Sequence, residues 1–173
     1  ALLDRGAPDM WPPLIDAITV APGFEAALGA ALGEDLDAPA DEAAPVHWRT
    51  RAPYAPPPAL PAGAAPLASQ VTAPPALARR LGQIGIVEDA ATGDRLAAEL
   101  RPGQRLVSRA GALWRWDGFT VTEGAATAAA IRLEQRNRLI EVRDSLRDAE
   151  AEAREAREAA QAARTLFEQS EAE

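Results

Sequence analysis

The sequence contains no cysteine among its 173 residues. This absence excludes disulfide bonds, thiolate metal ligands and a thiol nucleophile, and it agrees with a reducing compartment. Histidine is nearly absent too, because His47 is the single one, so a metal site built from several histidines is excluded. A lone histidine beside Trp48 more often packs or sits at an edge than binds a ligand. We therefore predict no metal and no cofactor.

Other signatures of catalysis and of membranes are missing as well. No glycine-rich loop precedes Lys and Ser or Thr, and no serine lies in a nucleophile-elbow sequence. Glu88 and Asp89 could act as general acid and base, but acids at strand ends are common in loops. No apolar run approaches the roughly 20 residues that cross a bilayer, and the N-terminus lacks the regions of a signal peptide. We expect a soluble chain without catalytic activity.

Lysine is also absent, and the arginines are unevenly placed in a chain of net charge −8. Up to Pro45 nine acidic residues stand against one arginine, whereas residues 46–126 hold nine arginines against six acids. The stretch from Arg101 to Arg115 contains four arginines and no acid. Either these residues form a local basic surface, or they are solvated positions on strands and turns.

A long amphipathic helix is the clearest feature that is present, from about Thr127 to Glu173. No glycine or proline interrupts it, and at roughly 1.5 Å per residue it would extend about 70 Å. Its seam is rich in alanine, so it requires a partner helix that approaches closely. Apolar residues step along the seam at a and d positions of a heptad: Leu139, Val142, Leu146, Ala149, Ala153, Ala156, Ala160, Ala163 and Phe167.

The preceding residues alternate between strand and helix patterns, which predicts an α/β or α+β body. In the first half, the patterns predict a strand over 14–20, a helix over 24–36 and a short strand over 46–49. Gly29 inside the helix predicts close packing against a neighbouring element. Eight prolines between residues 37 and 66 indicate connecting material.

The second half repeats the alternation. A helix from Pro74 or Pro75 to Leu81 ends at Gly82, and a buried strand follows over 84–87. A helix over 90–100 and a hairpin then follow, with hairpin strands over 105–108 and 112–116 and a turn at residues 109–111. A second turn at Asp117 and Gly118 leads to a strand over 119–121, Gly124 ends the body, and Thr127 caps the long helix.

This order of parts resembles the hinge domain of bacterial SMC proteins, the chromosome-condensation ATPases, and most closely an alphaproteobacterial form. Four segments carry the resemblance: WPPLID (11–16), VAPGFEAALGAALG (20–33), PPALARRLGQIGIVED (74–89) and PGQRLVSRAGALWRWDGF (102–119). It implies an α+β hinge of two halves with small mixed sheets and short helices, followed by a coiled-coil helix. The implied parts are an incoming arm stump (1–10), a first half (11–51), a connector (52–66), a second half (67–124) and an outgoing arm (125–173).

The resemblance also implies partners. A second copy would pair through the hairpin region, for which the matching residues are Gly111, Trp114, Trp116, Gly118, Phe119 and Val121. DNA would be bound weakly through phosphates, and the matching residues are Arg79, Arg80, Arg101, Arg105, Arg109, Arg115, Arg132, Arg136 and Arg138. The ATPase head, the kleisin and the accessory subunits would belong to other parts of the full-length protein. The expected location is the cytoplasm, at the nucleoid, with no membrane partner.

Two alternatives remain at this point. Trp114 and Trp116 share one face of the predicted strand, where two indoles form either a core layer or an interface anchor. At the level of the whole chain, the competing class is a coiled-coil scaffold or adaptor whose globular head binds another protein through the Pro-rich connector. An enzyme with a helical tail has the least support.

Overall fold

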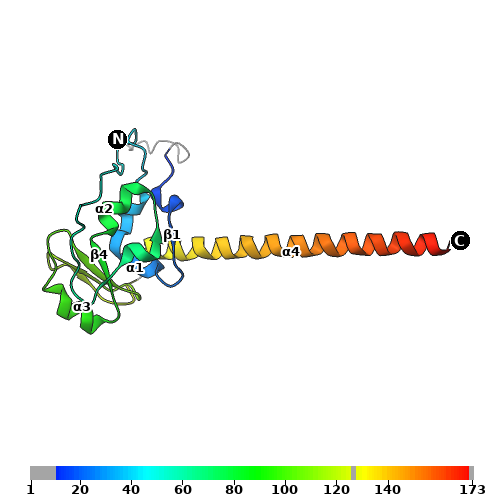
Figure 1. Ribbon diagram of the computed structural model, residues 1–173. Helices are drawn as coiled ribbons and strands as arrows, with labels where there is room; N and C mark the ends of the chain where they lie inside the picture. The colour runs from blue at the N-terminus through cyan, green and yellow to red at the C-terminus, as the bar shows by residue number, and fades with distance from the viewer. Residues whose placement is uncertain (1–10, 126–127, 172–173) are drawn as a thin grey trace. The chain divides into compact units, whose positions relative to one another are not determined.

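The computed structural model of the chain describes residues 11–125 and 128–171, with side chains in the last helix described up to residue 164 (Figure 1). The predicted stump (1–10), the predicted cap at Thr127 and the side chain of Phe167 lie outside the described residues. The chain divides into two compact units, Ala1–Gln135 and Arg136–Glu173.

The first unit contains a small mixed sheet of five strands in the order β2-β4-β5-β6-β7. Strands β4 and β5 are parallel, and every other neighbouring pair is antiparallel. The parallel pair is connected through helix α3, as a crossover between parallel strands requires. The strands are β2 (Ala65–Pro66), β4 (Ile84–Val87), β5 (Arg105–Ser108), β6 (Leu113–Arg115) and β7 (Thr120–Val121).

A second sheet joins the two predicted halves. It consists of β1 (Thr19–Val20) and β3 (Val71–Thr72), which run antiparallel with Val20 opposite Val71. The main apolar core mixes the halves in the same way, because Leu28 and Leu36 pack in one cluster with Leu67 and Leu77. The halves therefore share the main core and form one folded unit, while a smaller apolar cluster around Leu106 and Trp114 lies within the second half.

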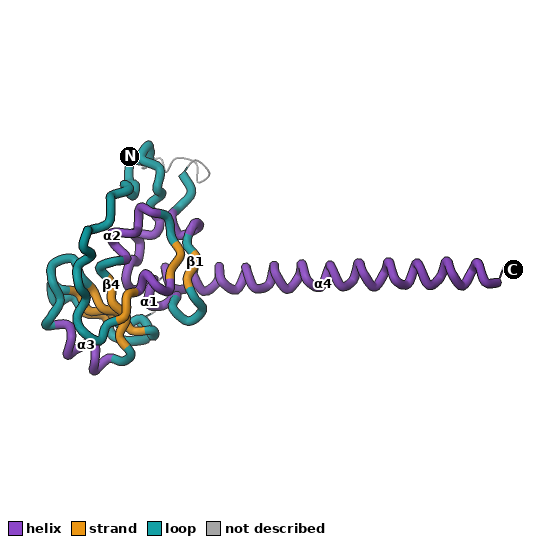
Figure 2. The backbone as a smooth tube through the Cα atoms, in the orientation of Figure 1, coloured by secondary structure: helices purple, strands orange, loops and turns teal. Residues whose placement is uncertain are grey.

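Short helices surround these sheets, as predicted. The α-helices of the body are α1 (Glu25–Leu32), α2 (Ala78–Leu81) and α3 (Ala90–Ala97). Within residues 11–125 there are also four 3-10 turns: η1 (Leu14–Ala17), η2 (Gly33–Asp37), η3 (Leu67–Gln70) and η4 (Pro75–Leu77). Residues 38–64 contain no helix or strand and run as loop, as the teal segments of Figure 2 show. This loop agrees with the proline-rich composition of the segment.

Two of the predicted strands are wrong or too long. Residues 14–17 turn into η1 after Pro13, where the N–H of Ile18 donates to the carbonyl oxygen of Ile15, so only residues 19–20 form a strand. No strand forms at 46–49. There, Trp48 makes two isolated hydrogen bonds and no ladder of strand-to-strand bonds. Its backbone N–H donates to the carbonyl oxygen of Pro39, and its indole donates to that of Asp35.

Two predicted helices are shorter than expected. Helix α1 ends at Leu32 because Gly33 adopts φ of +54°, a conformation that breaks the helical repeat, and the chain tightens into η2. Helix α3 ends at Ala97, and the next turns are tighter, with the N–H of Leu100 donating to the carbonyl oxygen of Ala97. The helix that starts at Pro75 and stops at Gly82 was predicted correctly.

Helix α4 (Ala128–Glu171) spans the boundary between the units, and its first turns belong to the body. Ala129, Ala130 and Leu133 are buried in that first unit. Beyond Gln135 the predicted seam is exposed: Leu139, Val142 and Leu146 leave about half of their surface to solvent. This part of α4 therefore presents an exposed apolar stripe, as a single helix of a coiled coil would without its partner helix.

Candidate dimer interface and basic surfaces

The predicted hairpin is present, and its turn packs against the body. Gly111 adopts φ of +88°, which suits glycine, and the hydroxyl of Ser108 accepts a hydrogen bond from the N–H of Ala112 at 3.1 Å. A β-carbon on Gly111 would lie 3.4 Å from the side chain of Ala26 in α1. Gly111 is therefore buried against α1, and its clear role is to shape this turn.

Trp114 belongs to the core and not to an exposed interface. Only 4% of its surface is exposed, and its Nε1 donates to Asp94 Oδ1 at 2.7 Å. A β-carbon on Gly93 in α3 would lie 2.5 Å from Cζ2 of this indole, so the glycine leaves the space that the ring fills. The side chain has almost no surface to offer a partner, and we no longer assign it to the interface.

Trp116 behaves differently, because β6 ends at Arg115 and the second indole stands beyond the strand with 48% of its surface exposed. Phe119, across the turn that contains Gly118, is 52% exposed. The guanidinium of Arg115 lies 5.1 Å from the centre of the Phe119 ring and forms an ion pair with Asp117. Two large aromatic side chains are thus held at the surface on one tight turn.

This turn lies beside an open sheet edge. Strand β7 is the last strand of the five-stranded sheet, and within the described residues it pairs only with β6. Thr120 is exposed, whereas Val121 is half-buried opposite Leu113. The outer side of β7 therefore leaves backbone donors and acceptors available to another strand. Trp116, Gly118, Phe119 and Val121 gather at this edge, which we call the β7 edge.

The arginines between residues 101 and 115 mostly bind the body itself. Arg105 donates to the carbonyl oxygen of Ala31, and Arg115 pairs with Asp117. Arg109 donates to the carbonyl oxygen of Gly23 at 3.3 Å and lies over the ring of Phe24 at 4.5 Å. Arg101 is exposed. These contacts favour the structural reading of the arginine-rich stretch over the continuous basic surface.

Arginines near the start of α4 also have partners. Arg132 forms a two-armed ion pair with Asp37 of η2, and hydrogen bonding to that carboxylate raises the pKa of Arg132. Arg136 is half-buried. Arg138 pairs with Glu141 at 3.3 Å, yet 77% of its side chain is exposed. Arg138 is therefore accessible to a phosphate in spite of its local partner.

Arg79 and Arg80, the remaining predicted DNA ligands, lie together on α2. Arg79 donates from Nε and Nη2 to the carbonyl oxygen of Ala52, at 3.0 and 2.7 Å. They line a pocket with Arg49 and Arg51, two residues that the sequence analysis did not single out. No spacing signal links residues about thirty positions apart, so only folding brings these four arginines together.

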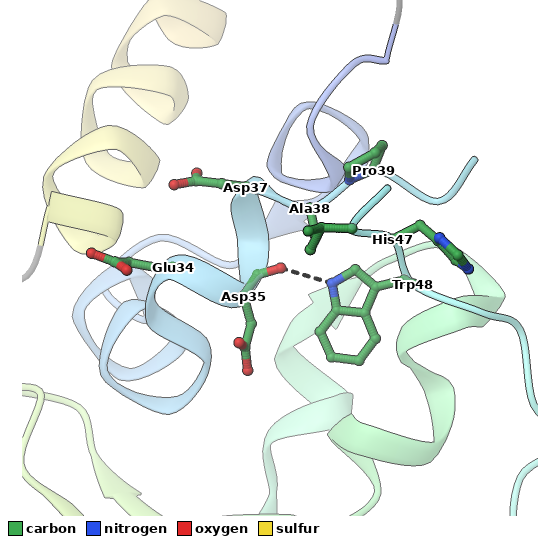
Figure 3. Close-up of a pocket in the computed structure, with 8 residues that line it drawn as sticks. Glu34, Asp35, Asp37, Ala38, Pro39, His47 and Trp48 are labelled. Carbon is green, nitrogen blue, oxygen red and sulfur yellow. Dashed lines mark hydrogen bonds between the residues drawn. The ribbon is translucent and has the colours of Figure 1, made fainter. Parts of the chain in front are cut away.

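One pocket that the described residues form is acidic, with a volume of about 670 Å³, and includes Glu34, Asp35, Asp37, His47 and Trp48 (Figure 3). The indole of Trp48 donates to the carbonyl oxygen of Asp35 at 2.7 Å, and the imidazole of His47 points away from the acids. Nδ1 of His47 lies 2.7 Å from the carbonyl oxygen of Ala44. Among the described residues, no group of three side chains is placed to hold a metal ion.

Comparisons with known proteins agree with this architecture. Residues 7–97 match the family model described as "SMC proteins Flexible Hinge Domain". The chromosome partition protein Smc of Rhodopseudomonas palustris is 50% identical over 152 residues, which are 88% of this chain and 13% of that protein. The protein of the same name from Cereibacter sphaeroides is 51% identical over 154 residues, again 88% and 13%. The chain thus spans about an eighth of these relatives.

Solved structures share the fold at low sequence identity. An asymmetric dimer of the Geobacillus stearothermophilus SMC hinge domain matches with a TM-score of 0.54 and 19% identity, covering 79% of this chain and 68% of that one. A structure described as the folded elbow of cohesin matches with a TM-score of 0.51 and 13% identity, covering 83% and 24%.

Proposed function

The chain belongs to the family of flexible hinge domains of SMC proteins, and on that premise we propose that it is the homodimerising hinge of a chromosome partition protein. In this proposal the module joins the coiled-coil arms of two copies. Its own surface supplies the contact, and chemistry such as ATP hydrolysis resides in parts of the longer protein outside these 173 residues. Kleisin and accessory subunits would likewise bind those other parts.

The observation that carries the proposal is the β7 edge. Trp116 and Phe119 are about half exposed beside a strand whose outer side pairs with no other strand in the part of the chain that the structure describes. Exposed aromatic side chains next to an open strand edge are an aggregation hazard unless a partner covers them. Aromatic anchors also contribute a large share of the binding energy in protein interfaces. A second copy that adds its strand to β7 would cover both features.

Sedimentation equilibrium on the 173-residue chain tests this. We expect a dimer, and we expect the double variant Trp116→Glu, Phe119→Glu to weaken it by at least about a hundredfold, since two charges would enter an apolar contact. Val46→Glu is the matched control, because Val46 is also an exposed apolar residue but belongs to the loop of residues 38–64. Equal weakening by the control would contradict an interface at the β7 edge.

Truncation separates the hinge from the scaffold alternative. A chain that ends after Gln135 keeps the whole first unit, including buried Leu133, and lacks the exposed seam of α4. A hinge predicts that this shorter chain still dimerises with unchanged affinity. A coiled-coil scaffold predicts that dimerisation disappears with the arm, and that result would overturn the hinge proposal.

We also propose weak, sequence-independent contact with DNA near the root of the arm. Arg138 supports it, because 77% of its side chain is exposed. Arg147 is a matched control, with a side chain that is 76% exposed and a similar ion pair to a neighbouring acid on the same helix. We expect binding that falls steeply with salt and that Arg138→Glu weakens more than Arg147→Glu. Equal effects would mean that general charge, and not this place, controls binding.

The expected place of action remains the cytoplasm, at the nucleoid, as part of this proposal. Within the described ranges 11–125 and 128–171, the chain has no helix that could cross a bilayer.

A further inference from the structure

A second pocket, of about 290 Å³, differs in character from the rest of this acidic chain. Its charged lining side chains are all arginines, Arg49, Arg51, Arg79 and Arg80, and the aromatic residues Trp48 and Tyr54 also line it. We call this site the basic pocket. Residues of the loop, of α2 and of the turn at Pro102 and Gly103 form it together, all within the first unit.

Arg80 is the arginine of this pocket whose guanidinium has the poorest set of acceptors. Its Nε is inaccessible to solvent and has no hydrogen-bond partner within the described part of the chain. Among the described residues Arg80 makes one hydrogen bond, a long one of 3.5 Å from Nη1 to the carbonyl oxygen of Gly103. Burial lowers the pKa of Arg80, although attraction by Asp35 opposes this effect. The guanidinium of Arg80 is therefore partly desolvated with few acceptors, which is unfavourable, and an anion bound beside it would offset that cost through charge attraction.

The neighbouring arginines are arranged to assist. The guanidinium of Arg79 is fixed by its two bonds to Ala52 and lies 4.4 Å from the centre of the Tyr54 ring. Arg49 uses Nε to bind Glu42 at 3.0 Å, which leaves its other nitrogens available. Arg51 is exposed and has no hydrogen bond or ion pair among the described residues. Positive charge is therefore concentrated around a small volume, and the guanidinium of Arg79 is already held in one orientation.

The size and the aromatic lining restrict the kind of anion. The volume of about 290 Å³ lies at the lower limit of small-molecule pockets, which begin at about 300 Å³, so it exceeds the need of a single phosphate and would enclose only part of a larger ligand. Guanidinium groups bind phosphate oxygens in a forked, two-bond geometry. A diphosphate concentrates its charge on few atoms, unlike the spaced carboxylates of an acidic peptide. Arg79 covers one face of the Tyr54 ring, so the rest of Tyr54 and the part of Trp48 that lines the pocket offer the surface for a planar base.

We propose that the basic pocket binds a nucleoside diphosphate, with the phosphates on Arg80 and Arg51 and the base against Trp48 or Tyr54. The site is separate from the β7 edge in its residues and does not depend on the proposed dimer. No hydrolysis is part of this proposal, because no acid lines the pocket to act as a base. The ligand would act by neutralising Arg80 and joining the loop to α2.

Isothermal titration of ADP into the 173-residue chain at low salt tests the proposal. We expect ADP to bind with a dissociation constant below about 1 mM. Arg80→Gln should weaken binding at least about tenfold, because a charged hydrogen-bond partner is lost. Arg51→Gln, at an exposed position that leaves folding intact, should weaken binding several-fold. Arg95→Gln, an exposed arginine of α3, is the control and should change nothing. No binding of ADP, or equal effects of all three variants, would overturn the site.

Two further probes examine the identity of the ligand. Pyrophosphate should bind at least several-fold more weakly than ADP, because it lacks the base; equal affinity would overturn the nucleoside part of the assignment. A single-stranded oligonucleotide should displace ADP only when its concentration, counted in nucleotides, is higher than the concentration of ADP. Displacement at much lower concentration would identify the pocket as part of a nucleic-acid surface and overturn the small-molecule proposal.

Discussion

A β-carbon built on Gly29 would lie 2.5 Å from the backbone nitrogen of Ala130, so helix α1 and the first turn of α4 approach until their backbones touch. Glycine is unfavourable inside a helix, where it costs about 1 kcal/mol relative to alanine, so its presence here needs an explanation. The close packing of α1 against α4 is that explanation. Through this contact the start of the long helix is built into the hinge body and not merely attached to it.

Gly29→Ala should destabilise the first unit by about 1–3 kcal/mol, because the new methyl group meets backbone atoms that cannot move independently. Gly82→Ala is the matched control. Gly82 has φ of −65°, and its nearest neighbour would be an ordinary 3.4 Å from the new β-carbon. Urea unfolding measures both changes, and a Gly29→Ala chain as stable as the Gly82→Ala chain would contradict this packing.

Two leucines on α4 provide a second matched pair. Leu133 is 1% exposed and packs in the main core, whereas Leu139 is 47% exposed. Leu133→Ala should cost about 2–5 kcal/mol of unfolding free energy, and Leu139→Ala should cost less than about 0.5 kcal/mol in this chain. Denaturant titration distinguishes them. Similar losses at both sites would mean that the seam beyond Gln135 already has a partner.

Substitutions at the two indoles should also differ in their effect on stability. Trp114→Phe replaces a buried indole with a smaller phenyl ring and removes its bond to Asp94, and we expect a loss of about 1–2 kcal/mol in stability. Trp116→Phe should change the stability of the monomer by less than about 0.5 kcal/mol, since the side chain is half exposed. Thermal unfolding at low protein concentration is the measurement. A larger loss at Trp116 would reverse our assignment of core and surface.

The start of α3 predicts a dependence on acid. Asp89 caps the helix, and the hydrogen bond from the backbone N–H of Thr92 lowers the pKa of Asp89 below its ordinary 3.8. A carboxyl group whose pKa is lower in the folded state stabilises the fold above pH 3.8. That contribution is lost as the pH falls through the folded pKa.

Asp89→Asn isolates this effect, because asparagine also caps helices but does not titrate. Thermal unfolding of both chains from pH 7 to pH 2 should show that any advantage of aspartate is constant above about pH 5 and shrinks below pH 3.8. An advantage that stays constant down to pH 2 would show that Asp89 remains ionised or does not cap α3.

Local features of the sequence were sufficient for much of the fold. The strand at Ile84–Val87, the helix that stops at Gly82 and the hairpin around Gly111 were predicted because each depends on neighbouring residues. Their apolar spacing and turn residues act over a few positions. The strand predicted at 46–49 failed because Trp48 bonds to Pro39 and Asp35, partners outside any local pattern.

The sequence by itself determined that a mixed body of two halves leads into a long helix with an apolar seam, because periodicity and turn chemistry are local properties. Only the tertiary structure decided which indole is covered, since Gly93 had to lie beside Trp114. It also decided which arginines are already bound, as Arg132 is to Asp37, and which gather around one pocket, as Arg51 and Arg80 do. Burial and charge pairing depend on residues that are distant along the chain, so they are settled only when the chain folds.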